Sequence, residues 1–328
     1  MLANNEANEN SSNKNQQINN IRTRIHPAEE LNSILQTYCI EGQEFSPTAI
    51  RTIGTAVAKL ADSRMLNTAN QDLIWQFLKI QNDSLSNQKF PMNIVEIALK
   101  ILAEPDMPLK LYNDEWIINI INHFAEYCNE IFQNNEKKTQ IHSLFSIFRH
   151  LSFVVQQINL SDSSLYKLIS LSLPAYFLPS SSPSLQSSSC SLITAIFKKY
   201  SSLRNDIIID IFEAVDKNQG NPKYVPFPND VRKIVSSISI LFIELCQSIS
   251  SFPCDTESIT QEIIQFIIHN LISRSKSSAS MGKIFEKFTE DICALLSHPF
   301  YPISKIFLKI TFESLFPSIS KKDDNTRI

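Results

Sequence analysis

The stretch that decides the fold is Pro183–Val215, PSLQSSSCSLITAIFKKYSSLRNDIIIDIFEAV. On each side of the polar pair Ser201-Ser202, apolar residues recur at the spacing of an amphipathic helix. They are Leu185, Leu192, Ile193, Ile196, Phe197 and Tyr200 in the first helix, and Ile207, Ile208, Ile211, Phe212 and Val215 in the second. Ser182 can cap the first helix, which Pro183 opens without losing a hydrogen bond. Neither helix buries its apolar face alone, so the pair must stack on neighbours, as in an α-solenoid.

The composition favours helices over sheet and excludes some classes of protein. The 328 residues include only 4 glycines but 21 phenylalanines, whereas strands joined by tight turns would need more glycine. The net charge of −3 and a pI near 6.1 exclude a chain that holds nucleic acid by its overall charge. Local basic faces remain open at this point.

The cysteines and the N-terminus indicate an intracellular, soluble chain. The 6 cysteines lie singly, mostly in apolar periodic segments, and none has CxxC spacing, so we expect reduced thiols in the cytosol or nucleus. The first twenty residues hold no apolar core of a signal peptide. Residues 168–197 lack charge, but prolines and serines interrupt them, so we expect no membrane span.

The chain divides into four predicted segments. Residues 1–20 are rich in Asn and Ser and are expected to be disordered; residues 21–81 hold N-terminal helices. Residues 91–318 hold HEAT-like helical repeats, and residues 319–328 form a charged C-terminal tail. The repeat units start about 46 to 52 residues apart, close to the HEAT period, at Pro91, Lys137, Pro183, Asn229 and Met281. The predicted fold is therefore all-α: a HEAT-repeat α-solenoid of stacked antiparallel helix pairs.

Further apolar stripes at helical spacing support this period. Three of them are Ile141, Leu144, Phe145, Phe148, Leu151, Val155 and Ile158; Ile234, Ile238, Leu241, Phe242, Leu245 and Ile249; and Ile259, Ile263, Phe266, Ile267 and Leu271. Each stripe is expected to face the core.

The sequence shows no catalytic constellation. It has no Walker loop, GxGxxG, HExxH or GxSxG motif, and its four glycines are too scattered to cradle a phosphate. We therefore expect no enzymatic activity, cofactor, metal site or small-molecule substrate. A helical enzyme whose site converges only in three dimensions is the alternative, and pocket-lining His, Asp or Glu from different units would favour it.

The residues singled out for binding are basic. They are Lys198, Lys199, Arg204, Arg232, Lys233, Lys283 and Lys287. Because corners of successive solenoid units line up along one edge, these residues could form a shallow basic track for the phosphate backbone of duplex DNA. Arg232 and Lys233 are expected at the start of a helix, and Lys283 and Lys287 on one helix face. The alternative is that all seven are solvated charges on helix surfaces.

Three blocks of the chain carry a more specific pattern of residues. The first is Leu185-Gln186, Leu192–Phe197, Lys199-Tyr200, Arg204, Ile207-Ile208 and Asp210–Phe212. The second is Phe285-Glu286, Phe288, Asp291-Ile292, Pro299, Tyr301-Pro302 and Leu308, and the third is Met107-Pro108 with Tyr112. In these blocks the chain resembles the Nipped-B family of cohesin-loading HEAT-repeat proteins. The blocks keep the family's order and cover about residues 91–318 of a chain much shorter than typical members. Between Val215 and Val231 the family's connection is more basic than KNQGNPKYVPFPND.

The resemblance implies a scaffold that assists loading of the cohesin ring onto chromatin for sister chromatid cohesion. It implies nuclear partners, namely cohesin subunits, a helical-repeat loader subunit and duplex DNA, and stimulation of an ATPase that belongs to cohesin itself. A generic HEAT-repeat adaptor of the transport-receptor or phosphatase-scaffold kind is the alternative, since it would share the period without the gapless match over Leu185–Phe212.

Overall fold

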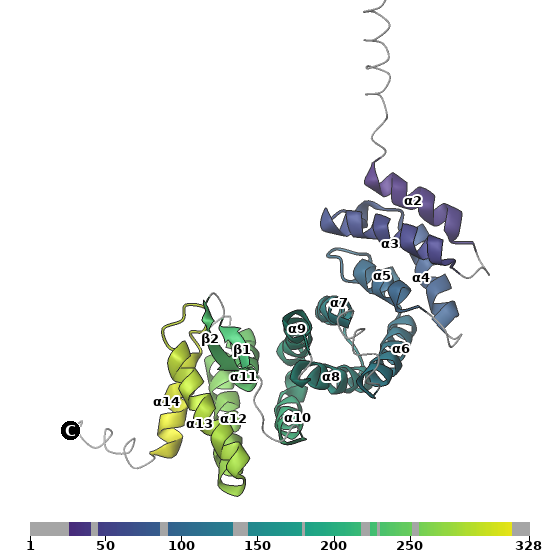
Figure 1. The fold of residues 1–328 in the computed structure, drawn as a ribbon. Helices are drawn as coiled ribbons and strands as arrows, with labels where there is room; N and C mark the ends of the chain where they lie inside the picture. Colours follow the sequence, from purple (N-terminus) through teal and green to yellow (C-terminus); the bar gives the residue numbers. More distant parts are fainter. Residues whose placement is uncertain are drawn as a thin grey trace, which may run out of the picture. The chain divides into compact units, whose positions relative to one another are not determined.

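The computed structural model describes residues 26–40, 45–85, 91–133, 144–178, 181–217, 224–227, 230–250 and 256–316. Within these ranges the chain forms thirteen α-helices, short 3-10 turns and one two-stranded hairpin. It divides into two compact units, Met1–Trp116 and Ile117–Ile328; Figure 1 labels their helices and strands. The predicted tails 1–20 and 319–328 lie outside the described residues.

The first unit is built on four helices: α2 (Pro27–Tyr38), α3 (Pro47–Asp62), α4 (Gln71–Leu85) and α5 (Met92–Leu102). Prolines open α2 and α3, and Ser46 caps α3 by accepting a hydrogen bond from the Ala49 amide. α3 packs against both α2 and α5. At the α3–α5 contact, a Cβ on Gly54 would lie 3.0 Å from Cδ1 of Ile97, so glycine permits this close approach.

The second unit contains most of α6 (Asp114–Gln133), then α7 (Leu144–Gln157), α8 (Asp162–Phe177), α9 (Pro183–Lys199) and α10 (Arg204–Lys217). The Ser182 hydroxyl caps α9 by accepting from the Leu185 amide, as predicted. α9 packs against α7, α8 and α11, so the stretch from which the fold was predicted contacts three other helices. The apolar stripes of α9 and α10 are buried, with Phe197 and Phe212 fully inaccessible.

The last four helices are α11 (Ser237–Ser250), α12 (Thr256–Ser277), α13 (Ala279–Leu295) and α14 (Ser304–Leu315). Four buried rings run from α10 through α11 and α13 to α14. Ring centroids are 5.2 Å apart for Phe212–Phe242, 6.3 Å for Phe242–Phe288 and 5.6 Å for Phe288–Phe307. Such tilted and edge-on pairs add to the burial energy, so this series of rings joins these four helices into one core.

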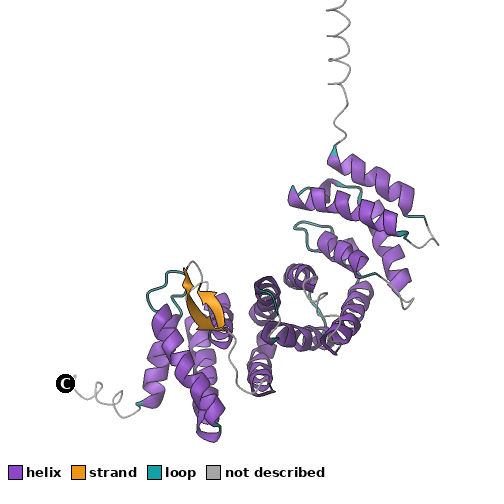
Figure 2. Cartoon of the chain, in the orientation of Figure 1, coloured by secondary structure: helices purple, strands orange, loops and turns teal. Residues whose placement is uncertain are grey.

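A hairpin precedes α11, where the sequence had predicted the start of a helix. β1 (Tyr224–Phe227) pairs antiparallel with β2 (Asp230–Ser236), with an irregularity at Pro226/Phe227 (Figure 2). Pro226 donates no backbone hydrogen bond, which a strand tolerates at an edge or a bulge. Placing Ile234 on the buried helix stripe was wrong: it lies in β2 and is 58% exposed, whereas its neighbour Val235 is buried.

Two other stripe assignments were wrong for a simpler reason. Phe145 is 40% exposed on α7 and Ile259 is 42% exposed on α12. Each lies at the edge of an apolar arc whose centre the neighbouring residues occupy, such as Leu144 and Phe148 on α7. Within the described residues, the predicted all-α architecture of stacked helix pairs is confirmed, and the hairpin is its one interruption.

Candidate partner-binding surface

The ammonium group of Lys199, which is partly exposed, is bonded to main-chain carbonyls of another helix end. Its Nζ donates hydrogen bonds to the carbonyl oxygens of Val155 (2.8 Å), Gln156 (3.3 Å) and Ile158 (2.5 Å). These carbonyls lie at the C-terminal end of α7, where a helix leaves acceptors without an intrahelical partner. Burial lowers the pKa of Lys199. Lys199 therefore caps α7, which limits the charge it presents to solvent.

Arg204 caps the C-terminal end of α9 by donating to carbonyl oxygens there. Its Nε donates to the carbonyl oxygen of Phe197 (3.0 Å) and its Nη2 to that of Lys198 (3.1 Å). The guanidinium also lies 5.8 Å from the centroid of the Phe197 ring. Arg204 thus fixes the corner between α9 and α10.

The other predicted residues differ in exposure and position. Lys198 on α9 and Lys283 on α13 are exposed. Arg232 and Lys233 belong to β2 and not to a helix start, which corrects the expectation from the sequence. Their side chains lie outside what the structure describes.

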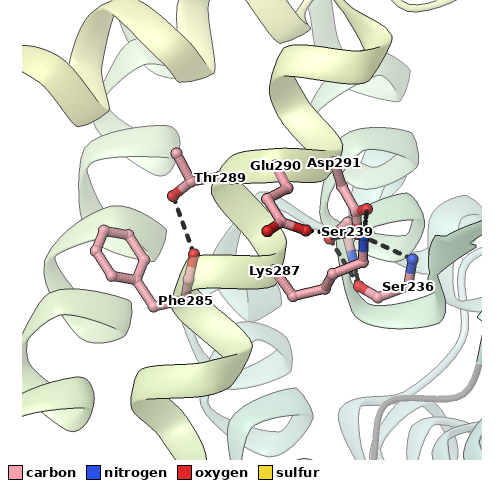
Figure 3. A network of polar contacts seen from close by, with 7 residues as sticks. All are labelled: Ser236, Ser239, Phe285, Lys287, Thr289, Glu290 and Asp291. Carbon is pink, nitrogen blue, oxygen red and sulfur yellow. Dashed lines mark hydrogen bonds and ion pairs between the residues drawn. The ribbon is translucent and has the colours of Figure 1, made fainter.

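Lys287 belongs to a polar network between α13 and the start of α11, in which Asp291, Ser236 and Ser239 are buried (Figure 3). Its Nζ lies 3.0 Å from Oδ1 of Asp291, which is 2% exposed, and 3.2 Å from Oε2 of Glu290. Oδ2 of Asp291 accepts hydrogen bonds from the Ser236 amide (2.9 Å) and the Ser239 hydroxyl (2.8 Å). Burial lowers the pKa of Lys287. The hydrogen bonds to Asp291 and Glu290, together with their charges, outweigh this effect, so the net shift of the pKa is upward. Lys287 is a partner in a structural network.

The described basic residues lie in two places in the second unit. Lys198 and Lys199 lie in the last turn of α9, and Arg204 opens α10 at the same corner. Lys283 and Lys287 lie one turn apart on α13. A shared basic track for a phosphate backbone stays a prediction.

A pocket between α9 and α11 was missed by the sequence reasoning. Its volume is about 480 Å³, and it is lined by Tyr176, Pro183, Gln186, Ser187, Cys190, Ser191, Thr194, Val225, Ile240 and Glu244. Glu244 is half-buried, and its Oε1 accepts a hydrogen bond from the hydroxyl of buried Tyr301 (3.0 Å). One signal was available, because Glu244 is the single charged residue in the helical run SISILFIELCQSIS.

Burial controls the ionisation of the groups in this pocket. It raises the pKa of Glu244, and the hydrogen bond from Tyr301 opposes that shift in part. Burial likewise raises the pKa of the Cys190 thiol to about 12, and the nearby Glu244 adds to this. At neutral pH the thiol stays protonated, so Cys190 is no activated nucleophile.

Neither a metal centre nor a membrane span is found in the part of the chain that the structure describes. No three His, Cys, Asp or Glu side chains there are grouped so that they could hold a metal ion. None of the described helices combines the length and apolar character needed to cross a bilayer.

The fold defines an all-α protein of the HEAT-repeat type. A solved structure, the C-terminal fragment of the cohesin loader SCC2 from Chaetomium thermophilum, superposes with a TM-score of 0.68 at 11% sequence identity. The match covers 89% of this chain and 30% of that fragment, so the chain spans less than a third of the fragment's length. No family model matches the sequence, and no curated protein matches it significantly. The resemblance seen in the sequence is thus confirmed at the level of the fold.

Proposed function

We propose that this chain is a non-catalytic scaffold of the cohesin-loader type. In this role it binds cohesin subunits and a helical-repeat loader partner in the nucleus. It assists loading of the cohesin ring onto chromatin and stimulates the ATPase of cohesin itself.

The superposition on the SCC2 fragment over 89% of the chain carries this proposal. The sequence blocks that resemble the loader family support it independently. The first block falls on α9 and α10, and the second on α13, α14 and the turn between them. Several of their apolar members, such as Phe197, Phe212, Phe288 and Tyr301, are buried in the second unit. The third block, Met107-Pro108 with Tyr112, lies between α5 and α6 in the first unit.

Duplex DNA is a further proposed partner. Lys198 and Lys283 are the exposed members of the basic set whose side chains the structure describes, and Lys199, Arg204 and Lys287 make internal bonds. Non-specific contacts with phosphates would then come from separate points on the surface. Such binding is expected to be weak and to fall steeply with added salt.

The experiment is affinity purification of the tagged full chain from nuclear extract of its own organism, with quantitative mass spectrometry. We expect cohesin subunits to be enriched over a tag-only control. As a matched control for folding, Phe212→Ala disrupts the core of the second unit and should lose the enrichment. Recovery of phosphatase subunits or transport receptors in place of cohesin would contradict the proposal and favour the generic adaptor.

A further inference from the structure

Glu244 is a half-buried acid with little to stabilise its charge. Its Oε1 accepts a hydrogen bond from the neutral hydroxyl of Tyr301, 3.0 Å away. Among the residues that the structure describes, no lysine, arginine or histidine forms an ion pair with it. A carboxylate withdrawn from water without a cation carries a desolvation cost. Asp291, on the neighbouring α13, shows the contrast, because Lys287 and two further donors surround it.

The surroundings of Glu244 form a pocket that a side chain can enter. Apolar atoms of Pro183, Val225 and Ile240 contribute to its walls, and the uncharged polar residues Ser187 and Ser191 complete them. Pro183, Ser187 and Ser191 are exposed, whereas Tyr176 is buried, so the pocket opens to solvent along the outer face of α9. The pocket thus combines an apolar wall, hydroxyl groups and a single negative charge.

We propose that this pocket binds a basic side chain, lysine or arginine, presented by a protein partner. The aliphatic stem of such a residue matches the apolar wall, and its cationic head matches Glu244. A planar guanidinium could also donate to the hydroxyls of Ser187 and Ser191. The negative charge disfavours phosphate groups, so the pocket is not a nucleic-acid site. The inference rests on the proposed function only in taking the cation to come from a protein.

The first test uses the full chain and a matched pair of probes. Benzamidine carries a planar cation on an apolar ring, and benzamide is its neutral counterpart of nearly the same shape. Isothermal titration calorimetry should detect benzamidine binding to the wild-type chain and none by benzamide. Absence of benzamidine binding would overturn the inference.

The second test changes the acid. Glu244→Gln keeps an oxygen to accept from Tyr301, so the variant should fold, which circular dichroism verifies. It should weaken benzamidine binding by about tenfold or more, the range for a hydrogen bond to a charged group. Glu286→Gln is the control, since Glu286 is an exposed glutamate of α13 that does not line the pocket. Equal binding by Glu244→Gln and wild type would also overturn the inference.

The third test separates a protein side chain from a free amine. The blocked tripeptide acetyl-Leu-Arg-Leu-amide should bind more tightly than agmatine, because flanking residues contact the apolar rim. If agmatine binds as well as the peptide, the assignment to a protein partner is wrong. These titrations use no cohesin, so failure to recover cohesin from extract would leave them unaffected and would count against the proposed function alone.

Discussion

Removing the carboxylate of Asp291 tests how the second unit is held together. In Asp291→Ala, the Ser236 amide, the Ser239 hydroxyl and the Lys287 ammonium lose an acceptor (Figure 3). The serine hydroxyls lie 2.8 Å apart, so Ser239 keeps Ser236 as an alternative acceptor. The Ser236 amide has no such alternative in the network, and an unsatisfied buried donor costs about 1–3 kcal/mol.

These terms give the expected magnitude. Lys287 keeps Glu290 and is partly exposed, so loss of its pair with Asp291 adds at most about 1 kcal/mol. We therefore expect Asp291→Ala to lower the free energy of unfolding by about 1–4 kcal/mol. Asp291→Asn keeps an oxygen for the two serine donors, and its cost should be about half as large.

The assay is urea unfolding of the full chain, followed by far-UV circular dichroism. Hydrogen exchange, read by mass spectrometry, should show faster exchange at the junction of β2 and α11 in Asp291→Ala. Lys287→Met is the companion variant, and together with Asp291→Asn it should be less destabilising than the sum of the single changes. A loss below about 1 kcal/mol in Asp291→Ala, or an equal loss in Asp291→Asn, would refute this account of the network.

Three further predictions concern the core, the acid and the basic surface. Phe212→Ala should cost about 3–5 kcal/mol in urea unfolding, because it removes a fully buried ring that contacts Phe242; an unchanged midpoint would show that α10 is not packed as described. Glu244 has a pKa raised above its unfolded value of about 4.3. The wild-type chain should therefore lose stability as pH rises from the unfolded pKa through the folded pKa of Glu244, and Glu244→Gln should melt higher than wild type at neutral pH. A pH-independent difference between the two melting temperatures would contradict this assignment. Lys198→Glu combined with Lys283→Glu should weaken duplex binding and reduce the slope of log affinity against log salt by roughly 2, whereas an unchanged slope in filter binding would remove both lysines from the DNA surface.

The helices and their buried faces could be predicted because they depend on local periodicity. Leu192, Ile196 and Phe197 follow the helical period, and the structure buries all three. Ser182 and Pro183 mark the start of α9 by chemistry that acts within a few residues. For this reason the all-α architecture could be derived from a single stretch of the chain.

The hairpin was missed because its signal is short and competes with the helix pattern behind it. Ile234 continues the three- and four-residue spacing of α11 backwards, yet it is exposed while Val235 is buried. Adjacent residues on opposite faces are the mark of a strand. The prolines in YVPFP were the clue that no helix begins here.

The basic residues were misjudged where their partners are distant in sequence. Lys199 follows the pattern of a solvated cation in a last helical turn, but the carbonyls it binds lie at the end of α7 and just after it, some forty residues earlier. A cation near a helix C-terminus has two acceptors available, water and another helix, and the sequence does not distinguish them. Only packing reveals which lysines remain on the surface.

Two acids at α11 have different roles: Asp291 of α13, which contacts the first turn of α11, and Glu244 of α11 itself. Asp291 is buried with three donors, so its charge stabilises the junction that it occupies. Glu244 lies in a pocket open to solvent with one neutral donor, and burial raises its pKa. Glutamine at this position would keep the hydrogen bond and remove the cost. An acid placed at such a cost is better explained by what enters the pocket than by what surrounds it, because groups with perturbed pKa values concentrate at sites of function.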